Sequence, residues 1–166
     1  MHRDIKPPGI LVGRQPLTVV LSDFGASRKI LPLGSEQVPD QPLTPGLVSW
    51  WSRAPDILFG QTYALPSDVW STGVTLVEIE QGRPPSQQNS EMAMIADICH
   101  AVGGGHSKEA SLEVRKQLRR QVTFQWGQRY GTKFQELVRT MLVFIPERRT
   151  SARAASEHDF LGGPQP

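Results

Sequence analysis

Residues 2–7 read His2-Arg3-Asp4-Ile5-Lys6-Pro7, and residues 23–25 read Asp23-Phe24-Gly25. Two apolar runs, at residues 10–12 and 17–21, lie between these motifs and flank the turn signal Gly13-Arg14-Gln15-Pro16. This pattern predicts a β-hairpin, and the β-branched run at 17–21 predicts that its second strand is buried. One motif therefore lies at each end of the predicted hairpin.

The two motifs carry carboxylates that the hairpin can bring to one site. One carboxylate, that of Asp4 or Asp23, can accept a proton from a hydroxyl group while the other holds Mg²⁺. Lys6, two residues after Asp4, can meet a phosphate group as a point charge. The chemistry that these residue types allow is therefore phosphate chemistry assisted by a metal ion.

Helical patterns dominate the rest of the chain. Ser67 is placed to cap a helix over 68–81 that is apolar on most sides and ends at Gly82, which predicts a buried core helix. Ser90 predicts the start of a second helix. The remaining expectations are a long exposed loop over 29–45, a polar helix over 107–120, an amphipathic helix over 134–142 closed by Pro146, and a short helix over 152–157.

Composition excludes several classes of protein. The 166 residues include 18 Lys and Arg against 16 Asp and Glu, a net charge of +2 that argues against a dedicated nucleic-acid binder. The single cysteine, Cys99, excludes an internal disulfide framework. No apolar run is long enough to span a bilayer, and the charged start is unlike a signal peptide. We expect an intracellular protein of the cytoplasm or nucleus, without nucleic-acid or membrane partners.

Three further motifs follow in order: Arg53-Ala54-Pro55-Asp56, the run SDVWSTG at 67–73, and Arg149 in the run IPERRTSA. With the first two motifs, and at these spacings, they resemble the eukaryotic protein kinases. The resemblance covers almost the whole chain, most loosely at about residues 83–130. It implies a protein kinase-like α+β fold, here a mainly α-helical C-terminal lobe with a short β-hairpin and no N-terminal lobe. A partial kinase domain would span 1–161, with a tail at 162–166.

The kinase subgroup follows from two stretches. Lys6 stands where serine/threonine kinases carry lysine, and residues 48–55 are similar to the matching stretch of the cyclin-dependent and MAP kinase group, although Ser52 replaces the usual tyrosine. In that group Arg53, with Val48, would shape a pocket that favours proline after the phosphoacceptor. The implied reaction transfers the γ-phosphate of ATP to Ser or Thr of a protein substrate with Mg²⁺. A cyclin-like regulatory protein is an implied partner.

The resemblance also implies a role for each motif residue. Asp4 would be the catalytic base, Lys6 would steady the transferred phosphate, and Asp23 would hold Mg²⁺. The other roles belong to the activation segment and its supports: Thr44 as a phosphorylated residue faced by Arg3 and Arg28, Ser49 bonded to Asp4 and Lys6, Asp68 accepting bonds from the catalytic-loop backbone, a buried ion pair of Asp56 with Arg149, and His2 as a structural histidine.

Some of these residues also have plainer interpretations. Thr44 precedes Pro45 and is equally well explained as an ordinary loop threonine. Trp50, Trp51 and Trp70 are expected to pack rather than to stack on a substrate. The basic run at 115–120 reads as a solvated helix face, with docking as the alternative, and Gly103-Gly104-Gly105 reads as a connector.

Two departures from the family pattern bear on activity. Gly9 stands where the family carries an asparagine that holds a second Mg²⁺, and the Gly-rich loop and its partner lysine have no counterpart. We therefore expect little activity from the chain alone, and we expect Val69, Trp70, Leu76 and Val77 to lack packing partners, which would make it marginally stable. Three hypotheses stay open: an active kinase recorded incompletely, a pseudokinase or protein-interaction module, and a decayed or alternatively spliced product.

Overall fold

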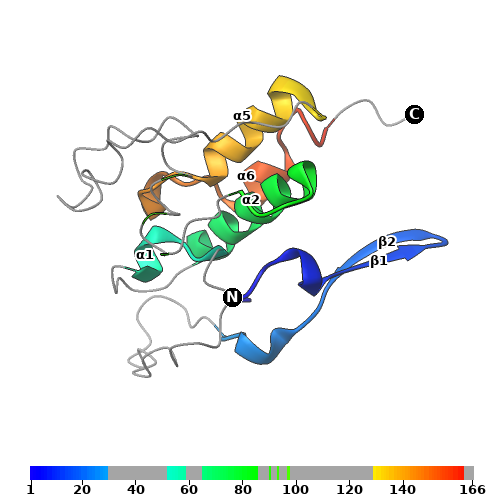
Figure 1. The fold of residues 1–166 in the computed structure, drawn as a ribbon, viewed down its shortest axis with the longest axis horizontal. Helices are drawn as coiled ribbons and strands as arrows, with labels where there is room; N and C mark the ends of the chain where they lie inside the picture. Colours follow the sequence, from blue (N-terminus) through cyan, green and yellow to red (C-terminus); the bar gives the residue numbers. More distant parts are fainter. Residues whose placement is uncertain are drawn as a thin grey trace.

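The computed structural model describes residues 1–29, 52–58, 65–85, 90, 93, 97 and 129–162. The described part consists of one β-hairpin and a group of helices (Figure 1). Its elements are the strands β1 (Ile10–Arg14) and β2 (Leu17–Leu21), the helices α1 (Pro55–Leu58), α2 (Leu65–Gln81), α5 (Gly131–Met141) and α6 (Ala152–Ser156), and the 3-10 helices η1 (Pro7–Gly9), η2 (Phe24–Ala26) and η4 (Pro146–Arg148).

The hairpin and three of the predicted helices are therefore present, with bounds shifted by a few residues. The hydroxyl of Ser90 accepts the Ala93 N–H at 3.2 Å, and Ala93 is helical, as the predicted cap requires. The rest of that helix lies outside the described residues. So do most of the loop predicted at 29–45, the helix predicted at 107–120 with its basic run, the three consecutive glycines, Trp50 and Trp51.

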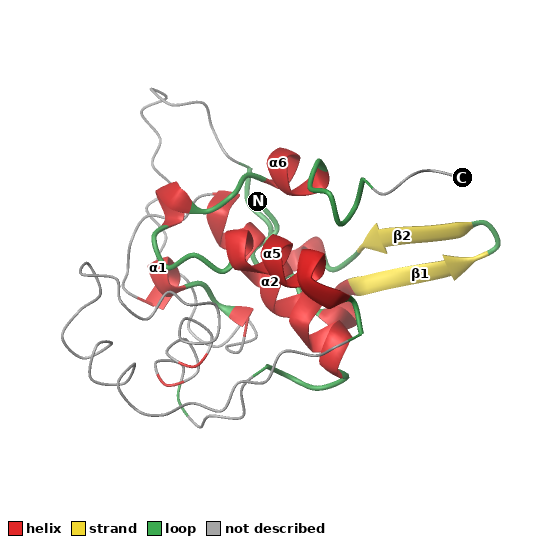
Figure 2. Cartoon of the chain, turned by 90° about the horizontal axis from the view of Figure 1, so that it is seen from above, coloured by secondary structure: helices red, strands yellow, loops and turns green. Residues whose placement is uncertain are grey.

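Helix α2 is the centre of the helical part, and α5 packs along it (Figures 1 and 2). The side chain of Trp70 is fully buried, which confirms its predicted packing role. At Gly73 the two helices come so close that a Cβ atom would lie 2.9 Å from Cδ2 of Leu142, so a residue without a side chain is required here. The fully buried side chains of this core include those of Trp70, Val74, Val77, Phe134, Leu137, Val138 and Leu142.

The course of α2 differs from the sequence-based expectation at its start. The helix begins at Leu65, so Ser67 lies within its first turn and is not the cap that the sequence predicted. The predicted end is confirmed, because Gly82 follows Gln81 with a φ of 69°, a left-handed conformation that glycine adopts without strain. The helix is not buried on every apolar side, since Ile79 is exposed.

The expectation that α2 lacks packing partners is wrong. Val69, Trp70 and Val77 are buried, and Leu76 is partly buried against the cluster that Val69 forms with residues of α5 and α6. The reason is that α5 and α6 already cover this face of α2. Marginal stability therefore does not follow from these four side chains.

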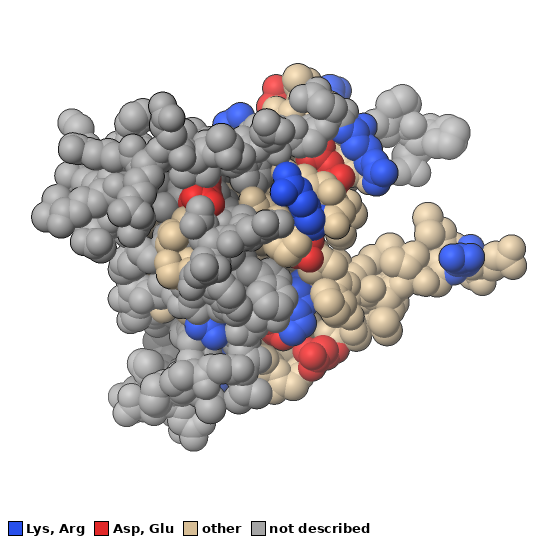
Figure 3. Space-filling model, viewed as in Figure 1, with Lys and Arg blue, Asp and Glu red and all other residues tan. Residues whose placement is uncertain are grey.

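The expectation of a buried second strand is also wrong. The strands are antiparallel, with Ile10 opposite Leu21 and Arg14 opposite Leu17. Every residue of β2 is exposed, and Leu17 and Val19 keep 77% and 68% of their surface accessible. The hairpin projects from the helices (Figures 1 and 2). The apolar side chains of α2, α5 and α6 pack on one another instead. Its surface is mostly uncharged (Figure 3).

Among the described residues, no helix is both long enough and apolar enough to cross a membrane.

Candidate functional site

The loop that carries the first motif is fixed to the start of helix α2. The carboxylate of Asp68 accepts the backbone N–H of His2 at 2.7 Å through Oδ2 and the N–H of Arg3 at 2.8 Å through Oδ1. Two turns further along α2, the hydroxyl of Thr75 reaches the carbonyl oxygen of Ile5 at 3.4 Å. The loop therefore takes its position from the most deeply packed helix of the molecule.

Asp4 and Lys6 form an ion pair within this loop. The Lys6 ammonium donates to Oδ2 of Asp4 at 2.7 Å, and the side chains keep 21% and 6% of their surface accessible, respectively. The Asp4 side chain is thus largely withdrawn from water, whereas the Lys6 side chain is partly exposed. Such a pair presents an acceptor for a hydroxyl proton directly beside a positive charge for an anion.

His2 stiffens the loop from the inside. Its Nε2 donates to the carbonyl oxygen of Ser22 at 2.9 Å, and its Nδ1 accepts the backbone N–H of Asp4 at 3.3 Å. Because a carbonyl oxygen only accepts, these two bonds fit the neutral imidazole with its proton on Nε2. The ring also lies 4.8 Å from the ring of Phe24, centroid to centroid, so His2 connects the two motifs.

The two motifs are also joined through the backbone. Met1 and Arg28 exchange two backbone hydrogen bonds of 3.0 Å each. Nε of Arg3 donates to the carbonyl of Ala26, and the Ser27 hydroxyl reaches the carbonyl of His2 at 3.3 Å. Residues on both sides of the hairpin are therefore held as one unit at its base.

Two residues of this unit have strained backbones. Arg3 and Asp23 adopt φ values of 75° and 63°, in the left-handed region that non-glycine residues rarely enter. Among the described residues they are the only non-glycine positions with positive φ. Strain of this kind persists where the surrounding structure enforces it, and it concentrates at functional sites.

The protein offers few side-chain oxygen atoms that could bind Mg²⁺. Asp23 offers one exposed carboxylate, and Gly9 supplies no side-chain oxygen. Within the described ranges no three His, Cys, Asp or Glu side chains gather as a metal cage. One carboxylate fits an ion that keeps water and phosphate oxygens as its other ligands, which is the usual habit of Mg²⁺ beside a nucleotide. It does not fit a second ion that needs a ligand at position 9.

A second cluster joins Asp56 of α1 to Arg149, which follows η4. Nη2 of Arg149 donates to Oδ1 of Asp56 at 2.8 Å, and both side chains are almost fully buried. The same guanidinium donates to the carbonyls of Pro66 and Val143, and it lies 5.3 Å from the ring centroid of Trp70. An ion pair with this many hydrogen bonds fixes its surroundings, because removing one partner would leave a buried charge.

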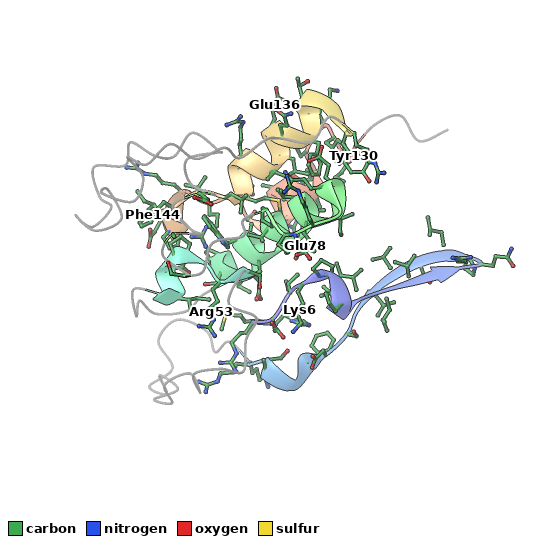
Figure 4. All side chains as sticks on the ribbon, viewed as in Figure 1. Lys6, Arg53, Glu78, Tyr130, Glu136 and Phe144 are labelled. Carbon is green, nitrogen blue, oxygen red and sulfur yellow. The ribbon has the colours of Figure 1, made fainter. Side chains whose placement is uncertain are left out.

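Not all of the predicted site residues can be placed. Thr44, Val48 and Ser49 lie outside the described residues. Arg53 is half-buried just ahead of α1, and Figure 4 shows it on the same side of α2 as Lys6. The structure thus brings His2, Arg3, Asp4, Lys6 and Asp68 together, and it brings Asp56 and Arg149 together as a second group.

The sequence did not reveal which hydroxyl groups hold these two clusters of residues in position. Ser22 donates to the Gly9 carbonyl from both its N–H, at 2.8 Å, and its hydroxyl, at 3.1 Å. Its place next to Asp23 is the only sequence signal that could have indicated this. On α2, the hydroxyls of Ser71 and Thr75 lie among apolar residues, and a small polar residue in a buried face was the available signal. The sequence pattern assigned Ser67 to a helix cap and not to its contact with Asp56.

Comparison with known proteins gives matches over almost the whole chain. The family profile described as "Protein kinase domain" matches residues 1–161. Cyclin-dependent kinase 4 of Xenopus laevis is 36% identical over 171 residues, which cover 97% of this chain and 50% of the relative. Cyclin-dependent kinase 4 of Mus musculus is 34% identical, with 97% and 52% covered. Cell division control protein 2 homolog 3 of Trypanosoma brucei brucei is 31% identical, with 97% and 53% covered.

The chain spans about half the length of the curated relatives that it matches. The order of the motifs, the strained loop held on α2 and the family match over nearly every residue point the same way. The chain therefore belongs to the protein kinase family and is related to the cyclin-dependent kinases.

Proposed function

We propose that these residues are the C-terminal, mainly helical lobe of a serine/threonine protein kinase domain. The complete domain would transfer the γ-phosphate of ATP to Ser or Thr of a protein substrate. The observation that carries this proposal is the Asp4–Lys6 pair, 2.7 Å apart on a loop whose backbone is bound by Asp68. The exposed apolar hairpin and the half-length match to the relatives support the assignment to one lobe of a larger domain.

Each residue of the site has a defined role in this reaction. Asp4 orients the substrate hydroxyl and accepts its proton. Lys6 offsets the negative charge of the phosphate in transfer. Asp23 is the residue that would hold Mg²⁺, and the ion, when bound, neutralises the phosphate oxygens of ATP. Asp68 keeps Asp4 in place through the backbone of the two preceding residues, and Nδ1 of His2 does so by accepting the Asp4 N–H.

The test compares Asp4→Asn with a distant control in the complete protein. The amide cannot take the proton, so we expect kcat for phosphorylation of Ser-Pro and Thr-Pro peptides to fall by about 10²- to 10⁴-fold. The KM for ATP should change little, because Asp4 does not bind the nucleotide. Asp159→Asn removes an exposed carboxylate near the C-terminal end and should leave both constants unchanged. Equal rates for wild type and Asp4→Asn would contradict the proposal.

A narrower part of the proposal concerns substrates and partners. Arg53 and Val48 would favour proline after the phosphoacceptor, and phosphorylated Thr44 would pair with Arg3 and Arg28. The relatives are named for their dependence on cyclin, which supports a cyclin-like partner for the complete protein. The 166 residues alone would have little activity.

The second candidate is a pseudokinase or protein-interaction module, and Gly9 favours it. A Cβ atom at position 9 would lie 3.6 Å from the Ser22 carbonyl and 4.0 Å from that of Asp4, so an asparagine can be introduced without a clash at its Cβ. If lack of this ligand limits a working kinase, Gly9→Asn should raise both kcat and the thermal shift produced by ATP with Mg²⁺. If the protein is an interaction module, neither quantity should change, and Gly9→Ala serves as the matched control.

A further inference from the structure

The carboxylate of Asp56 is held at both oxygens, and only one of them belongs to the ion pair with Arg149. The hydroxyl of Ser67 donates to Oδ2 at 2.5 Å, while Arg149 occupies Oδ1. Asp56, Ser67 and Arg149 are all buried, so no solvent molecule replaces a lost contact at low cost. A hydroxyl bonded to a carboxylate at this distance is among the stronger hydrogen bonds in proteins.

A second serine extends this contact along the same side of α2. Ser71, one turn after Ser67, donates to the carbonyl of Ser52 at 2.8 Å and to that of Ser67 at 3.2 Å. Residues i and i+4 share a helix face, so the two serines together hold the segment 52–58. Thus α2 binds this segment through hydroxyl groups and not through apolar packing alone.

The adjacent side of α2 holds the loop of the first motif. Asp68, the residue after Ser67, binds the N–H groups of His2 and Arg3, and Thr75 reaches the carbonyl of Ile5. A shift of the first turn of α2 would therefore move the supports of both segments at once. Ser67 connects the two, because its hydroxyl binds Asp56 and its backbone continues into Asp68.

We propose that Ser67 is a positioning residue: its bond to Asp56 fixes the first turn of α2, and through Asp68 it fixes the loop that carries Asp4. The helix start thereby couples the buried Asp56–Arg149 pair to the backbone of His2 and Arg3. The inference rests on the proposed function only in treating that loop as catalytic, since the contacts themselves require no activity.

The test uses an isosteric pair of variants in the complete protein, Ser67→Thr and Ser67→Val. Both add the same bulk, but only threonine keeps the hydroxyl. Amide hydrogen exchange should be about tenfold faster at His2 and Arg3 in Ser67→Val than in Ser67→Thr, the effect expected for losing a hydrogen bond to a charged group. Ser67→Ala, compared with wild type, repeats the test without added bulk if both larger variants misfold.

The control is a serine hydroxyl at another helix start. Ser151 caps α6, where it accepts the N–H of Ala154 at 3.1 Å. Ser151→Val and Ser151→Thr should differ in exchange around α6 and not selectively at His2 and Arg3. Equal exchange at His2 and Arg3 in the two Ser67 variants, or a uniform rise over all amides, would overturn the inference.

Kinase activity is measured separately from amide exchange. Ser67→Val should lower kcat more than it raises the KM for ATP, because it displaces the loop and not the nucleotide. If Asp4→Asn proves fully active while the exchange result holds, the proposed function fails and the positioning role stands. If Asp4→Asn is inactive and amide exchange at His2 and Arg3 is equal in the two Ser67 variants, the proposed function stands and the positioning role fails.

Discussion

Helix α2 and the β1–β2 hairpin are both rich in valine and leucine, yet these side chains are mostly buried in the helix and mostly exposed in the hairpin. Val74 and Val77 of α2 are fully buried, whereas Val19 and Val20 of the hairpin keep more than half of their surface accessible. The buried helix also contains more functional polar groups than the exposed hairpin, since Ser67, Asp68, Ser71 and Thr75 all bind other segments. Apolar composition alone therefore does not identify the core of this chain.

The difference arises from what each element can pair with. The apolar stripe of α2 meets α5 and α6, and its polar residues bind the carbonyl, amide and carboxylate groups of loops that pack beside it. Within the described part of the chain, neither face of the hairpin receives such a cover. If this comparison is right, equivalent substitutions should have very different effects in the two regions.

The largest effect is expected at Arg149. Arg149→Met leaves the carboxylate of Asp56 buried with a single hydroxyl partner, which should lower the free energy of unfolding by about 3–5 kcal/mol. Urea denaturation followed by circular dichroism measures this quantity. Arg148→Met, at the exposed neighbouring residue, is the control and should cost far less. A loss below about 1 kcal/mol at Arg149 would show that α2 does not depend on this ion pair.

An intermediate effect should come from one substitution made in each region. Val77→Thr places a hydroxyl in the core and should cost about 1–3 kcal/mol of unfolding free energy. Val19→Thr makes the same change on the exposed strand, where threonine suits a β-strand, and should stay within about 0.5 kcal/mol of wild type. Thermal unfolding of the two variants side by side checks the difference. Similar losses would mean that the hairpin is covered in solution.

The smallest effect is expected at Glu78 of α2 and depends on pH. Burial raises the pKa of the Glu78 carboxyl above its ordinary value of 4.5, and its Oε2 has no hydrogen-bond partner. The folded state therefore holds this proton more tightly than the unfolded state, so stability falls as the pH rises from 4.5 through the raised pKa. Glu78→Gln should stabilise the protein at pH 7 and have no effect well below pH 4.5.

Denaturation curves at several pH values test this expectation, with Glu136→Gln as the control. Glu136 lies on the exposed side of α5, away from α2 (Figure 4), so its replacement should not introduce a matching pH dependence. A gain for Glu78→Gln that persists unchanged at low pH would show that the benefit comes from helix propensity and not from charge.

Local patterns predicted most of the described elements. The turn residues before Leu17 predicted the hairpin, and Gly82 predicted the end of α2, because both depend on the conformations of neighbouring residues. The family motifs led to the pairing of Asp56 with Arg149, which lie 93 residues apart. Periodicity could not have done so, since nothing local distinguishes one arginine of the run 145–152 from the next.

Two kinds of error came from judging a residue by its local setting. Ser67 precedes an acidic residue and an apolar run, which is the pattern of a helix cap, but its hydroxyl is used by Asp56 from another segment. The run at Leu17–Leu21 has the composition of a buried strand, yet burial depends on what packs against it. In both cases the deciding partner is distant in sequence, so it was visible only in three dimensions.

The paired backbones of Met1 and Arg28 make the hairpin a convenient attachment point for a reporter. The hydrogen bonds between Met1 and Arg28 close the base of the hairpin, and the turn at Gln15 and Pro16 lies at its outer end (Figure 2). An exposed turn of this kind tolerates a short insertion or a fluorescent label. A label there would sense whatever covers Leu17 and Val19, while Asp4 and its supports keep their contacts.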